Sequence, residues 1–181
     1  NAAFYSNRGN ALRELGQLEE ALKSYDKAIQ LKPDLAEAYN NRGNVYLSLW
    51  EHELAVEDYT EALRLDPAYT SAYNGLGRTH RDLGHFEQAV NYFTKAIEIN
   101  PREGQAYLER GNTYLQLREH GLAEADYTEA MRIGPDEGDP YYYRGLLYRQ
   151  SVRYDEAVAD FTLAFERYET RGVKARVLTA R

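Results

Sequence analysis

The chain has 181 residues, 43% of them hydrophobic and 28% charged, which is the balance of an ordinary soluble folded protein. Its net charge of -7 disfavours binding to nucleic acid or to an anionic membrane, because both need a basic face. The absence of cysteine excludes disulfides and thiolate metal or redox sites, and no apolar run reaches the roughly 18 residues of a membrane span.

Helix–turn–helix units are predicted from the N-terminus onward, at residues 2–35, 36–69, 70–103, 104–137 and 138–171. In the second unit, Tyr39, Gly43 and Tyr46 share one helix face at the spacing i, i+4, i+7. Gly16 and Gly84 follow the first helices of their units, where a left-handed cap is expected. In the first four units a proline ends the second helix, because the residue before proline is pushed out of the α region.

The fifth unit departs from this pattern. It carries Glu169 where the others carry proline, so its second helix is expected to run on toward Gly172. Residues 172–181 have apolar side chains at i, i+4 and i+5 and are interpreted as a capping helix that shields the last unit. The start of a further segment is the alternative.

The units repeat with a period of 34 residues, and several positions keep their residue type in all five. The tyrosines are Tyr5, Tyr39, Tyr73, Tyr107 and Tyr141, and the glycines are Gly9, Gly43, Gly77, Gly111 and Gly145. Two alanine columns follow, with an aromatic between them in every unit: Tyr25, Tyr59, Phe93, Tyr127 and Phe161. Small residues at fixed positions let paired helices approach closely, and the aromatic rings fill the space beside them.

These columns resemble the tetratricopeptide repeat (TPR), whose 34-residue pattern has an aromatic, L-G, an aromatic, A, F, A and P. The resemblance implies an all-α, right-handed solenoid of stacked antiparallel helix pairs. It also implies a protein-interaction scaffold rather than an enzyme. The sequence contains no nucleophile elbow, phosphate loop or zinc motif, so we expect neither catalysis nor a cofactor or metal.

In the TPR family the first helix of each pair lines a concave groove, and its residues not used for packing are candidates for contact with a peptide. These candidates are Asn7, Asn10, Asn40, Asn41, Asn44, Asn74, Arg78, Arg81, Glu109, Asn112, Tyr142, Tyr143, Leu146 and Arg149. Seven of the ten asparagines fall in this set, although asparagine is a poor residue inside a helix. A carboxamide both donates and accepts, so it can bind a peptide backbone, and the row resembles the asparagine ladder of O-GlcNAc transferase. The alternative is that asparagine only solubilises the wall.

One subtype of the family holds a C-terminal carboxylate in a clamp of lysine, arginine and asparagine. Ser6, Ser71 and Gly75 stand at the cationic positions of that clamp, so a chaperone-tail binder is disfavoured.

An arginine precedes the repeat glycine in four units, and a serine or aspartate stands 16 residues later. The pairs are Arg8 with Ser24, Arg42 with Asp58, Arg110 with Asp126, and Arg144 with Asp160. In the third unit both members change together, to Leu76 and Tyr92. This covariation predicts a contact between the two helices of one unit. A row of arginines for acidic ligands is the alternative.

Most of the 17 tyrosines fall in the aromatic columns and are expected to pack between helices. We expect the same of Trp50, Tyr154 and the four histidines.

The expected function is to bind an extended segment or a helix of another protein in the groove. An oligomerisation or spacing module that self-associates through its ends, and the substrate-recognition arm of a larger enzyme, remain open. Because the chain begins at Asn1 without an initiator methionine, we expect a fragment of a longer protein. The phrase N-R-G-N, at residues 7–10 and 41–44, is similar to many bacterial members of the family and favours a cytoplasmic origin.

Overall fold

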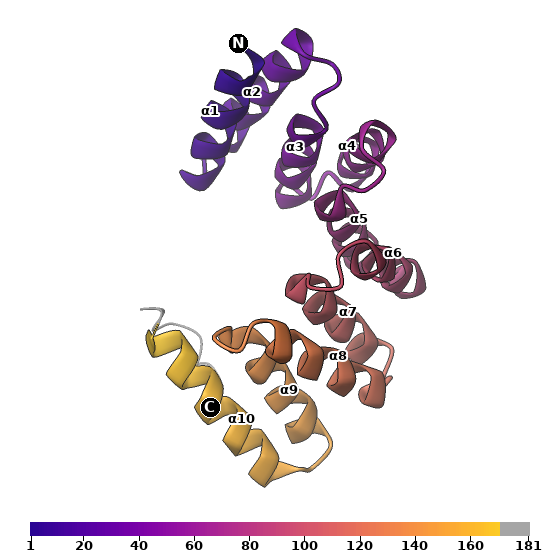
Figure 1. Ribbon diagram of the computed structural model, residues 1–181, viewed down its shortest axis with the longest axis vertical. Coiled ribbons are helices and arrows are strands. Elements are labelled where there is room, and N and C mark those ends of the chain that lie inside the picture. The colour runs from indigo at the N-terminus through magenta and orange to yellow at the C-terminus, as the bar shows by residue number, and fades with distance from the viewer. Residues whose placement is uncertain (171–181) are drawn as a thin grey trace. The chain divides into compact units, whose positions relative to one another are not determined.

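A computed structural model describes residues 1–170, which form ten α-helices joined by short turns (Figure 1). The helices are α1 (Ala2–Glu14), α2 (Leu18–Leu31), α3 (Ala36–Ser48), α4 (His52–Leu65), α5 (Thr70–Asp82), α6 (Phe86–Ile99), α7 (Gly104–Gln116), α8 (His120–Ile133), α9 (Gly138–Gln150) and α10 (Tyr154–Thr170). None of these helices is both long enough and apolar enough to cross a membrane.

Consecutive helices form antiparallel pairs: α1 with α2, α3 with α4, α5 with α6, α7 with α8, and α9 with α10 (Figure 1). The helices that precede a proline end as predicted. α2 stops at Leu31 and α4 at Leu65, and the capping residues Lys32 and Asp66 have ψ angles of 88° and 95°, far from helical values. Proline therefore separates one pair from the next.

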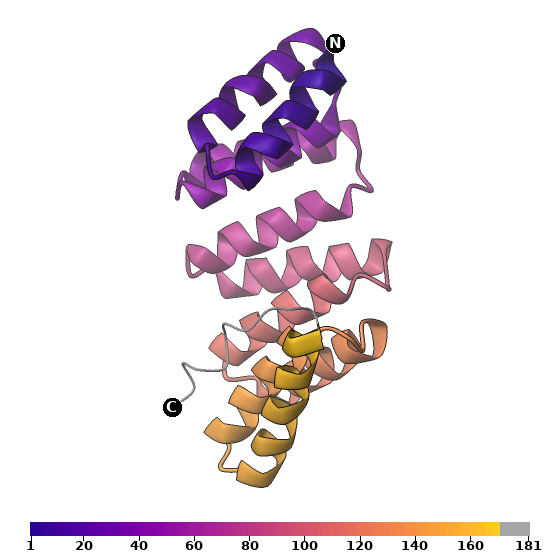
Figure 2. The same cartoon turned by 90° about the vertical axis from the view of Figure 1, so that its left-hand side faces the viewer.

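The contacts divide the chain into two compact units, Asn1–Ile99 and Asn100–Arg181, the second described as far as Thr170. In unit 1, α2 packs on α3 and α4 on α5, while the first helices α1, α3 and α5 contact one another in that order. In unit 2, α8 packs on α9, and α7 also contacts α9. Figure 2 shows the pairs as successive layers within each unit. The division into five repeats remains a prediction.

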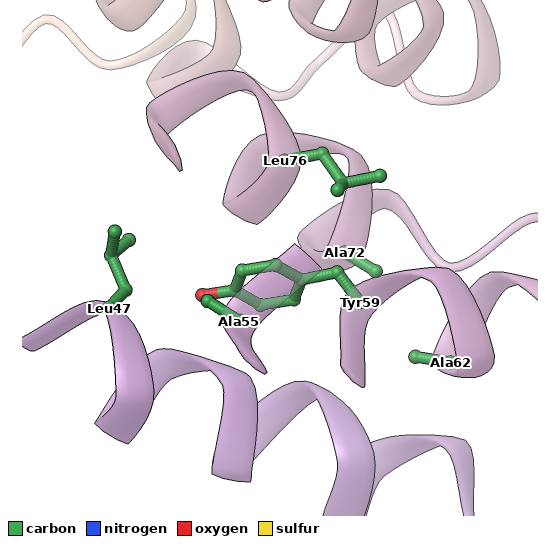
Figure 3. Close-up of a cluster of buried hydrophobic side chains, with 6 residues drawn as sticks. All are labelled: Leu47, Ala55, Tyr59, Ala62, Ala72 and Leu76. Carbon is green, nitrogen blue, oxygen red and sulfur yellow. The ribbon is translucent and has the colours of Figure 1, made fainter. Parts of the chain in front are cut away.

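Tyr59 lies at the centre of a buried cluster in unit 1 (Figure 3). Its ring is fully buried and packs among Leu47, Ala62 and Leu76. The repeat glycine is needed beside it, because a Cβ atom on Gly43 would lie 2.9 Å from Cε1 of Tyr59. The close helix approach expected at this glycine column is thus confirmed.

The turn inside each pair contains a residue with a left-handed backbone. Gly16 and Gly84 have φ angles of 74° and 77°, as predicted. Trp50, Arg118 and Val152 take the same conformation, with φ angles of 62°, 60° and 61°. The turn geometry is therefore common to all five pairs, whether or not glycine is present.

The expectation that Trp50 and Tyr154 pack between helices is wrong. Their exposed fractions are 72% and 61%. Trp50 lies in the left-handed turn after α3, where its side chain leaves the helix interface and meets the His52 ring edge to face.

The last helix differs in length from the other second helices. α10 has 17 residues, whereas α2, α4, α6 and α8 have 14 each. It passes through Glu169 without a break, as expected where proline is missing. The predicted capping helix at 172–181 lies outside the described residues.

Candidate functional site on the first helices

The candidate groove residues fall into two sets, one on each unit. The first-helix face of unit 1 comprises Asn7, Asn10, Asn40, Asn41, Asn44, Asn74, Arg78 and Arg81, on α1, α3 and α5. The first-helix face of unit 2 comprises Glu109, Asn112, Tyr142, Tyr143, Leu146 and Arg149, on α7 and α9. The helices within each set are in contact, so each face is continuous within its own unit.

Three asparagines of unit 1 form a hydrogen-bonded network across α1 and α3. The Tyr25 hydroxyl donates to Oδ1 of Asn10 at 2.8 Å, and Nδ2 of Asn41 donates to the same oxygen at 3.0 Å. Nδ2 of Asn40 donates in turn to Oδ1 of Asn41 at 3.2 Å. The carboxamides are therefore oriented by one another and by a tyrosine of the second helix.

The tyrosine–asparagine contact recurs in other pairs. The Tyr59 hydroxyl donates to Oδ1 of Asn44 at 2.9 Å, and the Tyr127 hydroxyl donates to Oδ1 of Asn112 at 2.9 Å. Burial raises the pKa of Tyr59, so its hydroxyl remains a protonated donor at neutral pH. Each of these carboxamides has its oxygen fixed by the fold.

The two pairs without a tyrosine at this place also lack the asparagine. The third pair has Phe93 with Arg78, and the fifth has Phe161 with Leu146. Asparagine thus appears only where a buried hydroxyl requires an acceptor. Asn10, Asn44 and Asn112, which the sequence predicts as ligand contacts, therefore have a structural role as well, and the sequence signal for it is a covariation at a spacing of 15 residues.

Several of the predicted groove residues have structural roles, although they were predicted to take no part in packing. Asn10, Asn44 and Asn112 hold tyrosine hydroxyls, while Asn40 and Glu109 are only 3% and 9% exposed. These side chains are components of the fold, because they satisfy or fill its interior. Contact between any of them and a ligand remains a prediction.

The asparagine ladder of unit 1 stops at Gly75 for a steric reason. A Cβ atom added to Gly75 would lie 2.4 Å from Cε1 of Tyr59, which is 0% exposed and has no room to move. Any side chain at this position would displace the ring. Packing therefore explains why glycine, and not asparagine, stands at this position of the third helix pair.

Three polar atoms of unit 1 at one repeat position are buried without a hydrogen-bond partner in residues 1–170. They are Oγ of Ser6, Oδ1 of Asn40 and Oδ1 of Asn74, on α1, α3 and α5. An unsatisfied buried polar group typically costs about 1–3 kcal/mol. Such a repeated cost is unusual in a native structure and calls for an explanation.

The more accessible members of the unit 1 face are Asn7 and Arg78, both exposed. Arg81 is half-buried, and its Nε lies 3.8 Å from Oδ1 of the neighbouring Asp82. Asn7 lies on α1, which carries part of the carboxamide network, and Arg78 and Arg81 lie on α5 of the same unit.

The aromatic part of the unit 2 face packs against its own core. The Tyr143 ring stacks on the Tyr127 ring with their centroids 6.3 Å apart. The centroids of the Tyr142 and Phe161 rings are 5.8 Å apart. Both tyrosines are partly buried, and Arg149 is exposed. The two tyrosines thus serve the interior on one side and keep part of their surface in solvent on the other.

Unit 2 also contains a cavity of about 280 Å³ that sequence reasoning did not predict. It is lined by Gly104, Gln105, Leu108, Ala130, Ile133, Gly134, Glu137, Asp139 and Pro140, from α7, the end of α8 and the start of α9. Two of these residues are acidic and none is basic. The sequence signal was the glycine that begins α7, where α1 and α3 begin with alanine.

The predicted arginine–aspartate contacts are confirmed. Nε and Nη2 of Arg42 bind Asp58 at 2.8 and 2.6 Å, and Arg144 binds Asp160 at 2.7 and 2.8 Å. Arg110 with Asp126 and Arg8 with Ser24 complete the set. These arginines are therefore engaged between the helices of a pair, which argues against a row reserved for acidic ligands.

The histidines do not assemble a metal site. In the described part of the chain, no group of three or more histidine, aspartate or glutamate residues could hold a metal ion. The His80 ring stacks on Tyr92 with centroids 5.1 Å apart, which fits the packing role expected of it.

Comparison with known protein families gives three overlapping matches. A model described as TPR repeat matches residues 1–49, and two models described as tetratricopeptide repeat match residues 34–102 and 74–140. No curated protein matches the chain at a significant level.

Solved structures of similar fold include TTC0263, a thermophilic TPR protein of Thermus thermophilus. It is 26% identical, with a TM-score of 0.85, over 99% of this chain and 98% of that one. MamA is 27% identical with a TM-score of 0.75, over 91% and 96% of the two chains. YrrB, described as a TPR protein with an unusual peptide-binding site, is 25% identical with a TM-score of 0.67, over 99% and 91%. These matches confirm the predicted all-α architecture of helix pairs.

Proposed function

Because the chain belongs to the tetratricopeptide repeat family, we propose that it is a protein-interaction scaffold that binds an extended segment of a partner along the first-helix face of unit 1. The similarity to YrrB, a TPR protein with a peptide-binding site, supports this class of function. The partner's chemistry follows from the polar groups on that face.

The observation that carries the proposal is the orientation of Asn44. Its oxygen accepts from Tyr59, while its Nδ2 donates to none of residues 1–170. A carboxamide held in this way offers its donors to a carbonyl oxygen, and an extended peptide presents one such oxygen per residue. The unpaired oxygens of Asn40 and Asn74 would gain a partner if their side chains turned toward a peptide N–H group.

Hydrogen bonds to the backbone cannot provide the whole affinity. Each contributes roughly 0.5–1.5 kcal/mol net, whereas association costs at least about 4 kcal/mol. Side chains of the partner must therefore add contacts, and exposed Arg78 is placed on the same face to supply one. The scaffold recognises an extended backbone through its carboxamides and selects a sequence through its neighbouring side chains.

A peptide-display selection tests this assignment. Random 12-residue peptides, acetylated and amidated, would be selected on the wild-type chain and their dissociation constants measured for the variant Asn44→Leu/Tyr59→Phe. This variant carries the residue pair of the fifth helix pair, so it is expected to keep the packing while it removes the carboxamide together with the hydroxyl bound to it. Loss of one hydrogen bond should weaken binding by about two- to tenfold.

Tyr59→Phe alone is the matched control, because it retains Asn44 and should keep most of the affinity. Peptides that bind the double variant as tightly as the wild type would refute the placement on unit 1. Failure to select any peptide would refute peptide binding itself.

A further inference from the structure

We propose that the turns of unit 1 form a second docking surface, which binds a basic amphipathic segment of another protein. This surface, named here the turn edge, consists of residues 14–19, 48–53 and 82–87, where the two helices of each of the first three pairs are joined. None of these residues belongs to the first-helix face. The inference therefore goes beyond the proposed function and does not rest on it.

The three turns follow one another along one side of unit 1. The first helices α1, α3 and α5 have 13 residues each, and they contact one another in that order. Because each of them is followed by a short turn and an antiparallel partner, their C-terminal ends lie on the same side of the unit, where Figure 2 shows the turns. Side chains of the three turns therefore share one surface.

Each turn exposes a large apolar side chain. Leu15 is 73% exposed, Trp50 is 72% exposed and Leu83 is 40% exposed. Leu15 and Leu83 stand directly before the left-handed glycines Gly16 and Gly84, whereas Trp50 itself takes the left-handed conformation. Single apolar side chains on a surface are ordinary, but a row of them along one edge is typical of a site that contacts another protein.

Trp50 combines two features that are unfavourable in the isolated chain. Its left-handed backbone is strained for any residue with a Cβ atom, and its indole is mostly in solvent. Backbone strain that persists in a folded protein is concentrated at functional sites. Tryptophan is also one of the residues most enriched in the hot spots of protein interfaces. Contact of the indole with a partner accounts for both features.

The charge of the turn edge favours a basic partner. Its three segments contain no lysine or arginine and six acidic residues, all of them exposed: Glu14, Glu19, Glu51, Glu53, Asp82 and Glu87. Arg13 and Arg81 directly precede two of the segments, and both are half-buried. The exposed carboxylates therefore set the sign of the charge around the apolar row.

This excess of acid is not a general requirement of the turn between paired helices. The corresponding segments of unit 2 are residues 116–121 and 150–155, and each contains one acid and one arginine. Glu119 accompanies Arg118, and Asp155 accompanies Arg153. The combination of an apolar row with an acidic border thus distinguishes the turns of unit 1.

An amphipathic helix with lysine or arginine beside its apolar face complements such a surface. Its apolar side chains can cover Leu15, Trp50 and Leu83, while its cations reach the bordering carboxylates. A cation of the partner can also lie over the exposed indole face. Anionic lipid head groups would be repelled by the same carboxylates, which favours a protein segment over a membrane surface.

Trp50 reports directly on the turn edge, because it is the single tryptophan of the chain. The full chain would be titrated with a synthetic helical peptide that has leucine on one face, lysine on the other and no tryptophan. The matched peptide has glutamate in place of lysine. We expect the lysine peptide to shift the emission of Trp50 to shorter wavelength, saturably and less strongly at high salt. An equal shift with the glutamate peptide, or no shift with the lysine peptide, would overturn the proposal.

Substitution of Trp50 separates binding from stability. Trp50→Gly relieves the backbone strain, so the variant is expected to fold, yet its affinity for a fluorescein-labelled lysine peptide should fall at least about tenfold. Fluorescence anisotropy of the peptide measures this dissociation constant without the tryptophan. Leu15→Ser/Leu83→Ser changes two exposed side chains, keeps Trp50 and should weaken binding by about tenfold. Unchanged affinity in either variant would contradict the apolar contact.

A pair of isosteric variants tests the role of the carboxylates. Glu51→Gln/Glu53→Gln removes the two acids beside Trp50 and should raise the dissociation constant about three- to tenfold through loss of two exposed ion pairs. The control Asp34→Asn/Glu98→Gln makes the same change in net charge at exposed residues near the other ends of the helices, and should leave the affinity unchanged. Equal losses in both variants would reduce the effect to overall charge and refute the acidic border.

Two further measurements distinguish other occupants of the turn edge. Phosphatidylcholine vesicles that shift the Trp50 emission as the lysine peptide does would assign the surface to a membrane. A shift that grows with protein concentration alone would assign it to a second copy of the chain. Either result overturns the proposal.

The groove variant Asn44→Leu/Tyr59→Phe separates this surface from the proposed function. It should bind the lysine peptide as tightly as the wild type does, because neither residue belongs to the turn edge. Loss of that binding would place the peptide on the first-helix face and remove the turn edge as a site. Failure of the peptide selection, in contrast, would refute the groove and leave the turn edge standing.

Discussion

Arg42 and Asp58 form a two-pronged ion pair between α3 and α4, and the remaining nitrogen of the same guanidinium, Nη1, binds Asp26 of α2 at 2.7 Å. One arginine thus joins three helices from two successive pairs. The side chain of Asp58 is only 6% exposed, so the pair is largely removed from water. The hydrogen bonds that Arg42 donates to Asp58 raise the pKa of Arg42. Burial raises the pKa of Asp58, because its loss of water outweighs the hydrogen bonds that it accepts from Arg42.

A double-mutant cycle on this pair checks the coupling. Arg42→Leu leaves a buried carboxylate unpaired and should lower the free energy of unfolding by about 3 kcal/mol. Arg42→Leu/Asp58→Tyr installs the residues found at Leu76 and Tyr92 and should be at least about 1 kcal/mol more stable than the two single effects predict. Urea denaturation measures all four proteins, and simple additivity would contradict the coupling.

The hydrogen bond between Tyr59 and Asn44 should likewise appear as coupling between the effects of two substitutions on the free energy of unfolding. Tyr59→Phe removes the hydroxyl, and Asn44→Leu leaves the hydroxyl buried without its acceptor. Each should cost about 1 kcal/mol of unfolding free energy. The double variant, which matches Leu146 and Phe161, should recover about 1 kcal/mol of the summed loss. A double variant as unstable as the sum of its parts would mean that the two side chains act independently.

Substitution of Trp50, unlike the substitutions above, is predicted to stabilise the protein. Its left-handed backbone, with a φ angle of 62°, is strained for any residue with a Cβ atom, and its side chain is mostly in solvent. Trp50→Gly should therefore raise the free energy of unfolding by about 0.5–1 kcal/mol, which thermal and chemical denaturation both measure. The matched control is Gly84→Ala, which introduces the strain and should destabilise by a similar amount. A less stable Trp50→Gly protein would show that the indole contributes packing that outweighs the strain.

His80 should make stability depend on pH. Burial lowers its pKa, and the neighbouring His85 lowers it further; Gln88 offers a partly compensating hydrogen bond, and Tyr92 covers the ring. As the pH falls through about 6.5, the unfolded chain takes up a proton at this histidine while the folded chain does not, so stability is lost toward acid. The slope of unfolding free energy against pH that comes from this one group cannot exceed the value for uptake of one proton.

His80→Tyr tests the effect, because Tyr46 and Tyr114 occupy the equivalent position in other pairs. Denaturation midpoints at pH 7.5 and 5.5 should differ less for this variant than for the wild type. The exposed His85→Gln variant is the comparison and should retain most of the difference. An identical acid loss in His80→Tyr would assign the effect to other groups.

Helix pairs and their boundaries were predictable because their determinants are local. Proline stops a helix by sterics at its own position, as before Pro33 and Pro67, and the hydrophobic period marks the buried face of each helix. The Arg42–Asp58 contact was also predictable, since five copies of one unit allow paired substitutions to be compared within a single chain. Repetition thus supplied a small internal alignment.

The roles of the polar face were not predictable in the same way. The side chain of Asn44 is of a type that often binds ligands. Only the position of the Tyr59 hydroxyl reveals that its oxygen already accepts a hydrogen bond. Gly75 looks like a gap in a ladder, and only the Tyr59 ring 2.4 Å from its absent Cβ explains it. Trp50 has a large apolar side chain, as core residues do, yet the turn directs it into solvent.

Local patterns in the chain are sufficient to specify its helices, their pairing and the TPR family, because each depends on residues within about one 34-residue period. The orientation of a carboxamide, the exposure of a turn residue and the cavity between α7, α8 and α9 depend on atoms from several helices at once. Hydrogen bonding and steric exclusion act over a few ångströms between segments distant in sequence. They are therefore decided only when those segments are packed together.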